Sequence, residues 1–346
     1  MKHTIPAGLS LYLDMVRFLA AMAVVLHHTW PLIFPGLPLP WPGHSAVVVF
    51  FVLSGYVITH ASRPELGLRE YAQHRMARIL PVAIVAMLLS VAISQLSVSS
   101  SVPNSGVMVF SWQSLSLNML FLAQSWMDVS PSYNPPFWSL NYEVWYYIIF
   151  GTWVYTKNRV LTLLAVTIAG PKILLLLPVW LLGVALYKWT PMLGRRQAAH
   201  IFIASILVGL AFVWFDVAVH IREAMKIIWP VAMKLSGGSG LFVGDFLLGL
   251  IVAANFMAAA SLDMRILFRF KTPIRYLSSF TFSTYVFHMP LVILIWNGLD
   301  VHNASAFYAL LALLILVLGQ ITERQAKFYR SPLQWRIPTS IKSAEV

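Results

Sequence analysis

The first apolar stretch of the chain carries an arginine and a histidine at a spacing that suits chemistry inside a membrane. Arg17 and His28 are eleven residues apart in LDMVRFLAAMAVVLHHTW. At 3.6 residues per turn, both side chains project from one helix face, roughly 16 Å apart along the axis. Asp14 precedes Arg17 by three residues and is expected to pair with it. Imidazole titrates near neutrality, so His28 is a candidate general base. The alternative is an Asp–Arg pair with an interfacial histidine, which costs little near the bilayer edge.

A carboxylate interrupts another apolar stretch, FWSLNYEVWYYIIF. Glu143 lies about six residues into this stretch from the predicted outer side, roughly 9 Å deep at helical rise. This depth favours His28 over Arg17 as its partner. The alternative is a glutamate satisfied by Asn141, a tryptophan or backbone groups, because an unpartnered carboxylate in lipid is costly.

A second histidine lies late in the chain, in FSTYVFHMPL. Tyr285 and His288 are three residues apart, so they share a helix face near mid-membrane. We expect a kink at Pro290. A buried histidine at this depth could also be structural. Asp216 and Asp245 are expected to face water at the outer ends of their spans.

Small and basic residues mark the second apolar stretch and the loop that follows it. In VVVFFVLSGYVIT, Gly55 permits close helix contact, and we expect the Ser54 hydroxyl to bond its own backbone. In HRMARILP, Arg75 and Arg78 lie on one face of a helix entering the membrane and could clamp phosphate. Ordinary anchoring at the inner surface is the alternative.

The composition requires these side chains to be positioned by membrane helices. Hydrophobic residues make up 59% of the 346 residues and charged residues 10%, too few charges to coat a soluble globule of this size. The absence of cysteine excludes disulfides, thiolate metal sites and an acyl-cysteine intermediate, and we expect no metal. The net charge of +12 does not indicate nucleic-acid binding, because the basic residues fall in short loops between apolar segments.

The apolar stretches predict an all-α, polytopic fold with about ten transmembrane helices. We expect the spans near residues 11–29, 46–60, 79–97, 137–155, 160–170, 174–187, 201–219, 241–260, 278–297 and 305–321. The two short ones would form a hairpin turning at Gly170-Pro171. With both termini in the cytoplasm, 19 of the 24 Lys and Arg residues fall on the inner side and 4 on the outer side, as the positive-inside rule requires.

The moderately apolar segment 107–125 would reverse this charge bias if it crossed the membrane. We therefore expect an outer-leaflet or re-entrant piece. Residues 1–321 are predicted to form one integral-membrane domain, and residues 322–346 a short basic tail at the inner surface.

Five motifs in this order resemble the membrane acyltransferase 3 family, the integral-membrane O-acyltransferases of bacterial surface glycans. They are the Arg–ten residues–His motif, FFVLSGYVIT, the Arg-x-x-Arg motif, WSLNYEVWYY and STYVFHMPL. The resemblance covers the chain nearly from end to end. No SGNH-type hydrolase domain, which some members carry, is expected.

The resemblance implies a multi-pass enzyme of the bacterial cytoplasmic membrane that uses acyl-CoA. Acetyl is the default group and succinyl the alternative. The acceptor would be a hydroxyl of a glycan or a lipid-linked glycan, and polysaccharide synthesis machinery and membrane lipid are the expected partners. The hypothesis assigns catalysis to His28, Glu143 and Arg17. It assigns acyl-CoA binding to Arg75, Arg78, Tyr285 and His288. It assigns the positioning of these groups to Asp14, Ser54 and Gly55.

Two other classes of function stay open at this point. A transporter or flippase of lipid-linked sugars would also need intramembrane charges and broken helices, although no inverted-repeat signal is visible. A structural scaffold would not need the alignment of Arg17 with His28. Transfer of a labelled acyl group, as opposed to coupled uptake, separates the enzyme from the transporter.

Overall fold

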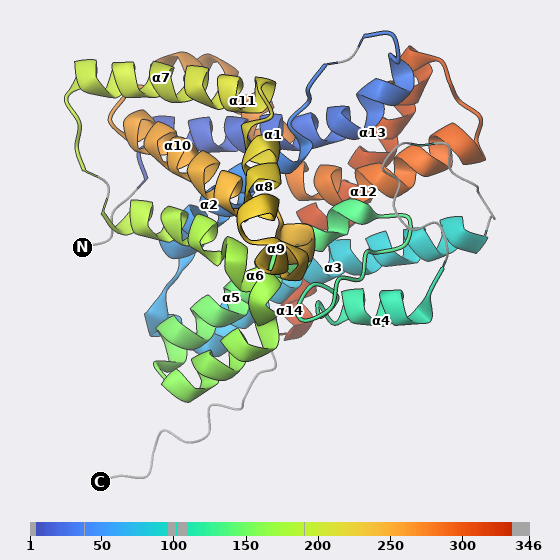
Figure 1. The fold of residues 1–346 in the computed structure, drawn as a ribbon, viewed down its shortest axis with the longest axis horizontal. Helices are drawn as coiled ribbons and strands as arrows, with labels where there is room; N and C mark the ends of the chain where they lie inside the picture. Colours follow the sequence, from blue (N-terminus) through green and yellow to red (C-terminus); the bar gives the residue numbers. More distant parts are fainter. Residues whose placement is uncertain (1–4, 38, 96–101, 103–109, 190, 334–346) are drawn as a thin grey trace.

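The chain folds into a bundle of helices, seen in a computed structural model (Figure 1). The structure describes residues 5–37, 39–95, 102, 110–189 and 191–333, and every regular element assigned within them is helical. The α-helices are α1 (Ala7–Ile33), α2 (Gly43–Ala61), α3 (Gly67–Gln95), α4 (Trp112–Met119), α5 (Trp138–Gly151), α6 (Arg159–Lys188), α7 (Arg195–Trp214), α8 (Val217–Ile228), α9 (Pro230–Ser236), α10 (Phe242–Ala260), α11 (Lys271–Ser278), α12 (Thr281–Ile293), α13 (Ala304–Ile321) and α14 (Ala326–Leu333).

The described helices confirm an all-α, multi-pass membrane protein. Seven of them are long and apolar enough to cross a membrane, and the number rises to eight if the bent pair containing α11 and α12 is one broken span. The predicted count of about ten and the cytoplasmic placement of both termini therefore stay predictions. The final residues of the predicted basic tail, 334–346, lie outside the described residues.

Several predicted spans differ from the observed helices at their ends. The predicted pair 160–170 and 174–187 occupies the single element α6, whose backbone breaks at Gly170 with φ +78°. This break falls where the hairpin was expected. Helix α5 is short and continues as a π-helix over Thr152–Thr156. Within the segment 107–125, α4 has only eight residues, about 12 Å of helix, which cannot cross a core of ~30 Å.

Close packing of α2 on α6 fixes the face of α2 that lines the functional site. A Cβ atom added at Gly55 would lie 2.1 Å from the Trp180 carbonyl oxygen, and one added at Gly183 would lie 1.9 Å from the Val52 carbonyl oxygen. The two backbones thus touch where both residues lack side chains, as small-residue helix packing in membranes requires. The predicted role of Gly55 in helix contact is confirmed.

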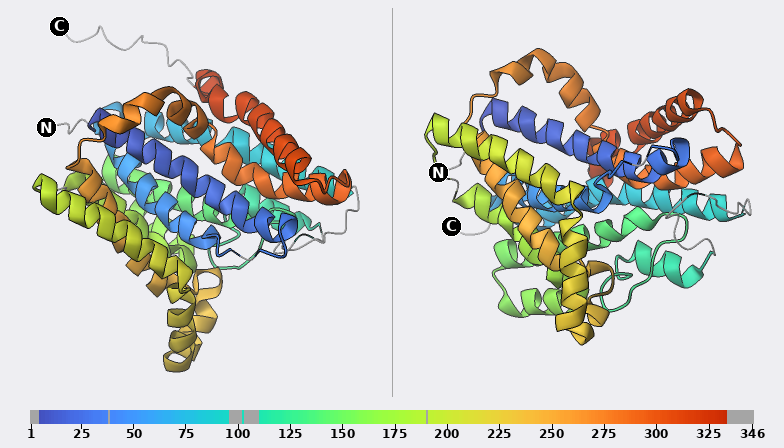
Figure 2. Two further views of the ribbon diagram at one scale, coloured as in Figure 1. Left: turned by 90° about the horizontal axis from the view of Figure 1, so that it is seen from above. Right: turned by 45° about the horizontal axis from the view of Figure 1, so that its top comes forward.

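Helix α12 lies in the core of the bundle, against α1, α3 and α13 (Figures 1 and 2). Nearly all of its residues, including every one from Ser283 to Ile293, are buried. The Glu323 carboxylate accepts hydrogen bonds from the backbone N–H groups of Phe282 (3.3 Å) and Ser283 (2.8 Å), which satisfies the first turn of the helix. The chain bends by 48° between the segments Arg265–Ser278 and Thr281–Gly298. The α-helix continues through Pro290, and the expected kink at this residue stays a prediction.

The segment after α7 leaves the bundle earlier than predicted. Helix α7 ends at Trp214, because Asp216 adopts a left-handed conformation with φ +46° and begins α8. Helix α8 has no buried residue, and Figure 2 shows α8 and α9 projecting away from the packed helices. This part of the chain contributes nothing to the walls of the site described next.

Candidate functional site

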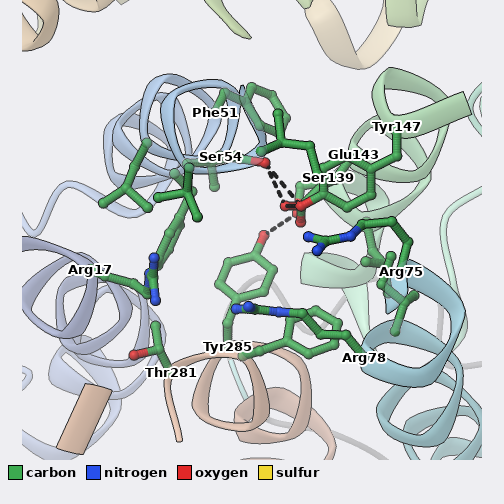
Figure 3. A pocket seen from close by; sticks show the side chains of 18 residues that line it. Arg17, Phe51, Ser54, Arg75, Arg78, Ser139, Glu143, Tyr147, Thr281 and Tyr285 are labelled. Atoms are coloured by element: carbon green, nitrogen blue, oxygen red, sulfur yellow. Dashed lines mark hydrogen bonds between the residues drawn. The ribbon is translucent and has the colours of Figure 1, made fainter. Parts of the chain in front are cut away.

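A cavity between α1, α2, α3, α5 and α12 collects most of the candidate residues (Figure 3). Its volume is about 810 Å³, including the space at its open mouth. Three guanidinium groups line it, those of Arg17, Arg75 and Arg78, together with the Glu143 carboxylate. The remaining wall is mostly apolar and comes largely from α2. The cavity therefore combines anion-binding groups with a lipophilic surface.

Arg17 is held by an acidic neighbour on its own helix, as predicted. The distance from Arg17 Nη1 to Asp14 Oδ1 is 3.5 Å. Asp14 also accepts a hydrogen bond from Arg275 at the end of α11, a partner that the sequence did not reveal. One carboxylate thus pairs with two guanidinium groups and ties α1 to α11.

The two arginines of α3 keep their charges available for a ligand. Among the described residues, neither Arg75 nor Arg78 forms an ion pair within 4 Å. The Arg75 guanidinium carbon lies 5.9 Å from the Tyr71 ring centroid and 5.8 Å from that of Tyr147, so cation–π contacts hold it without neutralising it. Its buried Nε has no hydrogen-bond partner in the described part of the chain. Cations of this kind suit phosphate groups.

Glu143 belongs to a hydroxyl network inside the cavity and not to His28. Its Oε1 accepts a hydrogen bond from Ser54 Oγ (2.8 Å) and another from the Tyr147 hydroxyl. Ser54 in turn accepts one from Trp180 Nε1 (3.2 Å). The expectation that Ser54 bonds its own backbone is therefore wrong, because a carboxylate attracts the hydroxyl more strongly. The predicted pairing of Glu143 with His28 is also wrong in this structure, where no hydrogen bond joins them within the described ranges.

His28 lies against the second predicted histidine. The ring centroids of His28 and His288 are 5.3 Å apart. His288 is fully buried and its Nδ1 bonds the Tyr285 carbonyl oxygen at 2.7 Å. His28 Nδ1 and His288 Nε2 are buried without a hydrogen-bond partner among the described residues. Arg17 and His28 both face α12, so the predicted common face of α1 is confirmed.

Tyr285 connects the histidine pair to the cavity. Its ring lines the cavity and lies 6.2 Å from the His288 ring. Its hydroxyl group bonds Ser139 Oγ at 2.7 Å and donates to the Pro136 carbonyl oxygen at 2.9 Å. Neither His28 nor His288 is among the residues lining the cavity. The Tyr285 ring therefore lies between the cavity and the His288 ring, and the His288 ring in turn contacts His28.

Two aspartates differ from each other in a way that the sequence did not predict. Asp216 is exposed, as expected. Asp245 is 1% exposed, and both its oxygens lie 2.9 Å from His44 Nε2. The expectation that Asp245 faces water is wrong, because α10 packs on α2 at this depth. Within the described ranges, no group of three or more His, Asp or Glu side chains could hold a metal.

Four side chains of the site were missed in the sequence, namely Tyr147, Ser139, Trp180 and Glu323. Tyr147 could have been found, since it follows Glu143 by four residues and must share its helix face. The other three reach their partners across 40 residues or more of chain. No local pattern indicates such contacts.

Comparisons with known proteins show the family of this chain. The family model described as the acyltransferase domain of the acyltransferase 3 family matches residues 10–324. The chain is similar to the acyltransferase MdmB of Streptomyces mycarofaciens, at 32% identity over 32% of this chain and 28% of that protein. It is also similar to the peptidoglycan O-acetyltransferase OatA of Listeria monocytogenes, at 26% identity over 93% of this chain and 55% of that protein.

The chain thus spans at most about half the length of these two relatives. No solved structure gives a significant match. The family model nevertheless covers most of the sequence, including Arg17, His28 and the late Tyr285–His288 segment. The chain belongs to the acyltransferase 3 family.

Proposed function

We propose that this protein is a bacterial inner-membrane O-acyltransferase. It would move an acyl group, acetyl foremost, from acyl-CoA in the cytoplasm to a hydroxyl group of an exported or surface polysaccharide. The observation that carries this proposal is the convergence of Arg17, Arg75 and Arg78 on one cavity. A coenzyme A thioester combines phosphate groups with a long neutral arm, which matches guanidinium groups followed by an apolar wall.

The donor would enter with its phosphates on Arg75 and Arg78, whose charges are not neutralised by an ion pair in the described part of the chain. Its arm would follow the cavity-lining face of α2, past the hydroxyl network of Ser54, Glu143 and Tyr147. That network offers hydrogen-bonding groups to the polar atoms of the arm. The thioester would then lie near Tyr285, at the far end of the cavity.

His28 would accept the proton of the acceptor hydroxyl. The oxygen attacks the thioester carbonyl carbon, the C–O bond forms, the C–S bond breaks, and the thiolate takes the proton from the imidazolium to leave as the free thiol. A thiol leaves readily because its pKa is about 8.5. Since Tyr285 and His288 lie between the cavity and His28, these rings must move apart for the thioester to reach it. Direct transfer and an acyl-histidine intermediate are both compatible with this placement.

The experiment compares surface glycans from cells with and without this protein by mass spectrometry. We expect the glycan of producing cells to be heavier by one acyl group, and isotope-labelled acetate fed to the cells should appear in it. Unchanged glycan masses, together with transport of a lipid-linked sugar that needs no acyl-CoA, would favour a transporter and overturn the proposal.

A further inference from the structure

A histidine of α2 and an aspartate of α10 form a polar pair outside the arginine cavity. His44 Nε2 lies 2.9 Å from both carboxylate oxygens of Asp245. Within the described ranges, His44 is the only side chain bonded to this buried carboxylate. An ionisable group buried between membrane helices is costly, so the pair serves either as a helix contact or as a functional site.

The pair does more than join two helices. Desolvation of a buried ion pair offsets most of its attraction, so such a pair adds little stability. The His44 side chain is also 29% exposed, against 2% for Asp245. In the described part of the chain, His44 Nδ1 forms no hydrogen bond, and this atom is not buried. The carboxylate thus holds one ring nitrogen and leaves the other open to a ligand.

His44 lies on the side of α2 that lines the cavity, at the end away from the α3 arginines. Val47 and Phe51, three and seven residues later, share its helix face, and both line the cavity. Ser54, which bonds Glu143, is ten residues away, about 15 Å along the helix. His44 therefore extends the cavity-lining face of α2 by about one turn.

The beginning of α2 lies next to the histidines of α1. A Cβ atom added at Gly43 would lie 2.5 Å from Cγ of the His27 ring, and the His27 and His28 ring centroids are 5.0 Å apart. His44 follows Gly43 directly. The open nitrogen of His44 is therefore at the same end of the bundle as His28, the proposed base.

The His44 ring is held in a fixed orientation. The Trp138 ring lies parallel to it within 10°, with centroids 5.7 Å apart. Trp138 itself packs edge-on against Phe51 and Tyr142. Since Asp245 fixes the ring at Nε2 and Trp138 fixes its plane, the direction of Nδ1 is set before a ligand arrives.

The chemistry around Nδ1 suits a hydroxyl group. A carboxylate accepts from the Nε2–H group, so Nδ1 accepts a hydrogen bond when the ring is neutral and donates one when it is protonated. A hydroxyl group can do both, whereas a phosphate or thioester oxygen only accepts. The Asp245 carboxylate also repels an anion. Arg222 of α8, within electrostatic range of His44, is paired with Glu223.

We infer that His44 binds a hydroxyl group of the acceptor sugar, with Asp245 as the residue that positions its ring. This inference rests on the proposed function, since it takes a glycan as the acceptor. It separates the two substrates along α2. The phosphates of acyl-CoA bind at the arginine end, and the acceptor binds at the His44 end, beside His28.

A double variant removes the site and keeps the packing. His44→Phe alone would leave a buried carboxylate unpaired, which destabilises the fold, so it is combined with Asp245→Leu; replacing a buried pair by apolar side chains costs little stability. We expect kcat/KM for the glycan to fall about 10–100-fold, the value of a hydrogen bond to a charged group. The KM for acetyl-CoA should stay unchanged, because the arginine end is untouched.

A milder variant tests the positioning role of the carboxylate. Asp245→Asn keeps the shape and an oxygen that accepts from His44, but removes the charge. We expect kcat/KM for the glycan to fall about fivefold, again without a change in the KM for acetyl-CoA. Tyr12→Phe is the control for helix contacts, because it removes another hydrogen bond to α10, that to Asn255 (2.5 Å), outside the arginine cavity. It should leave both constants unchanged.

The measurement is acetyl transfer by the purified full-length chain in detergent, with acetyl-CoA as donor and glycan extracted from cells lacking the protein as acceptor. Each substrate is varied with the other held constant, and size-exclusion profiles identify variants that fold. No transfer by the unaltered protein would remove the proposed function. Transfer by the unaltered protein, with the same kcat/KM for the glycan in every folded variant of His44 and Asp245, would overturn the acceptor site alone. An equal loss for both substrates would also overturn it.

Discussion

The two ends of one helix face on α1 lie in opposite surroundings. At Arg17, the face borders an open cavity with three guanidinium groups and a hydrogen-bonded carboxylate. At His28, eleven residues later, the face packs against the His288 ring, and the unpartnered nitrogens of both rings are buried. The difference follows from charge. A guanidinium group is always charged and needs polar surroundings, whereas a neutral imidazole can be packed in a core.

This difference indicates separate tasks for the two ends. The arginine end is open before any substrate arrives, so it is suited to binding. The histidine end is closed by Tyr285 and His288, so in the proposed mechanism it takes part only after these side chains move. A buried polar atom without a partner costs about 1–3 kcal/mol. A substrate hydroxyl bonded to the His28 nitrogen would remove that cost, which favours opening when substrate is bound.

The largest expected effect comes from the histidine end. His28→Ala should lower acyl transfer by about 10²–10⁴-fold, the usual contribution of a general base, while the protein still accumulates in the membrane. Glycan acylation measured against immunoblotted membrane protein checks this. His220→Ala is the matched control, because this exposed histidine lies on α8, which projects away from both ends of the α1 face. Full activity of the His28 variant would show that the histidine end of the α1 face takes no part in acyl transfer.

An intermediate effect is expected at the arginine end. Arg75→Ala should raise the KM for acetyl-CoA by about 10–100-fold, the value of one or two hydrogen bonds to a charged group, with a smaller change in kcat. Steady-state kinetics with purified protein measure both constants. Arg69→Ala, on the same helix and outside the cavity lining, should leave KM unchanged. Equal KM values in the Arg75 variant and the unaltered protein would indicate that Arg75 anchors its helix at the membrane surface and does not bind acetyl-CoA.

The features of the site that the sequence predicted correctly are those that depend on a single helix. The common face of Arg17 and His28, the Asp14–Arg17 pair and the proximity of Arg75 to Arg78 all follow from helical periodicity. The close contact at Gly55 follows from the lack of a side chain. Each of these properties is local, so the sequence determines it before the helices pack.

The parts that were wrong depend on how distant helices meet. Glu143 was assigned to His28 by depth alone, but depth does not say which neighbour a helix turns toward. The hydroxyls that bind Glu143 come from α2 and from its own helix. Ser54 is placed by the close packing of α2 on α6, where Gly55 faces Trp180 and Gly183 faces Val52. Asp245 was expected in water because its partner, His44, lies 201 residues away.

The smallest effect, and the sharpest test of the comparison, is expected for Glu143→Gln. Glutamine keeps the shape and can still accept from Ser54 and Tyr147, so the change removes only charge from a network inside the cavity. We expect the KM for acetyl-CoA to change by about fivefold, the difference between a charged and a neutral hydrogen-bond acceptor, with the pH dependence of kcat unaltered. Glu223→Gln on exposed α8 is the control.

A shifted pH profile of kcat in Glu143→Gln would mean the opposite. The carboxylate would then act on the proton-accepting imidazole, which requires Glu143 to leave Ser54 and Tyr147 when substrate binds and to cross toward His28. In that case the two ends would not be separate, and the structure would represent a state before the groups assemble. Measuring KM and the pH profile of kcat on the same variant therefore decides whether binding and reaction are divided along α1.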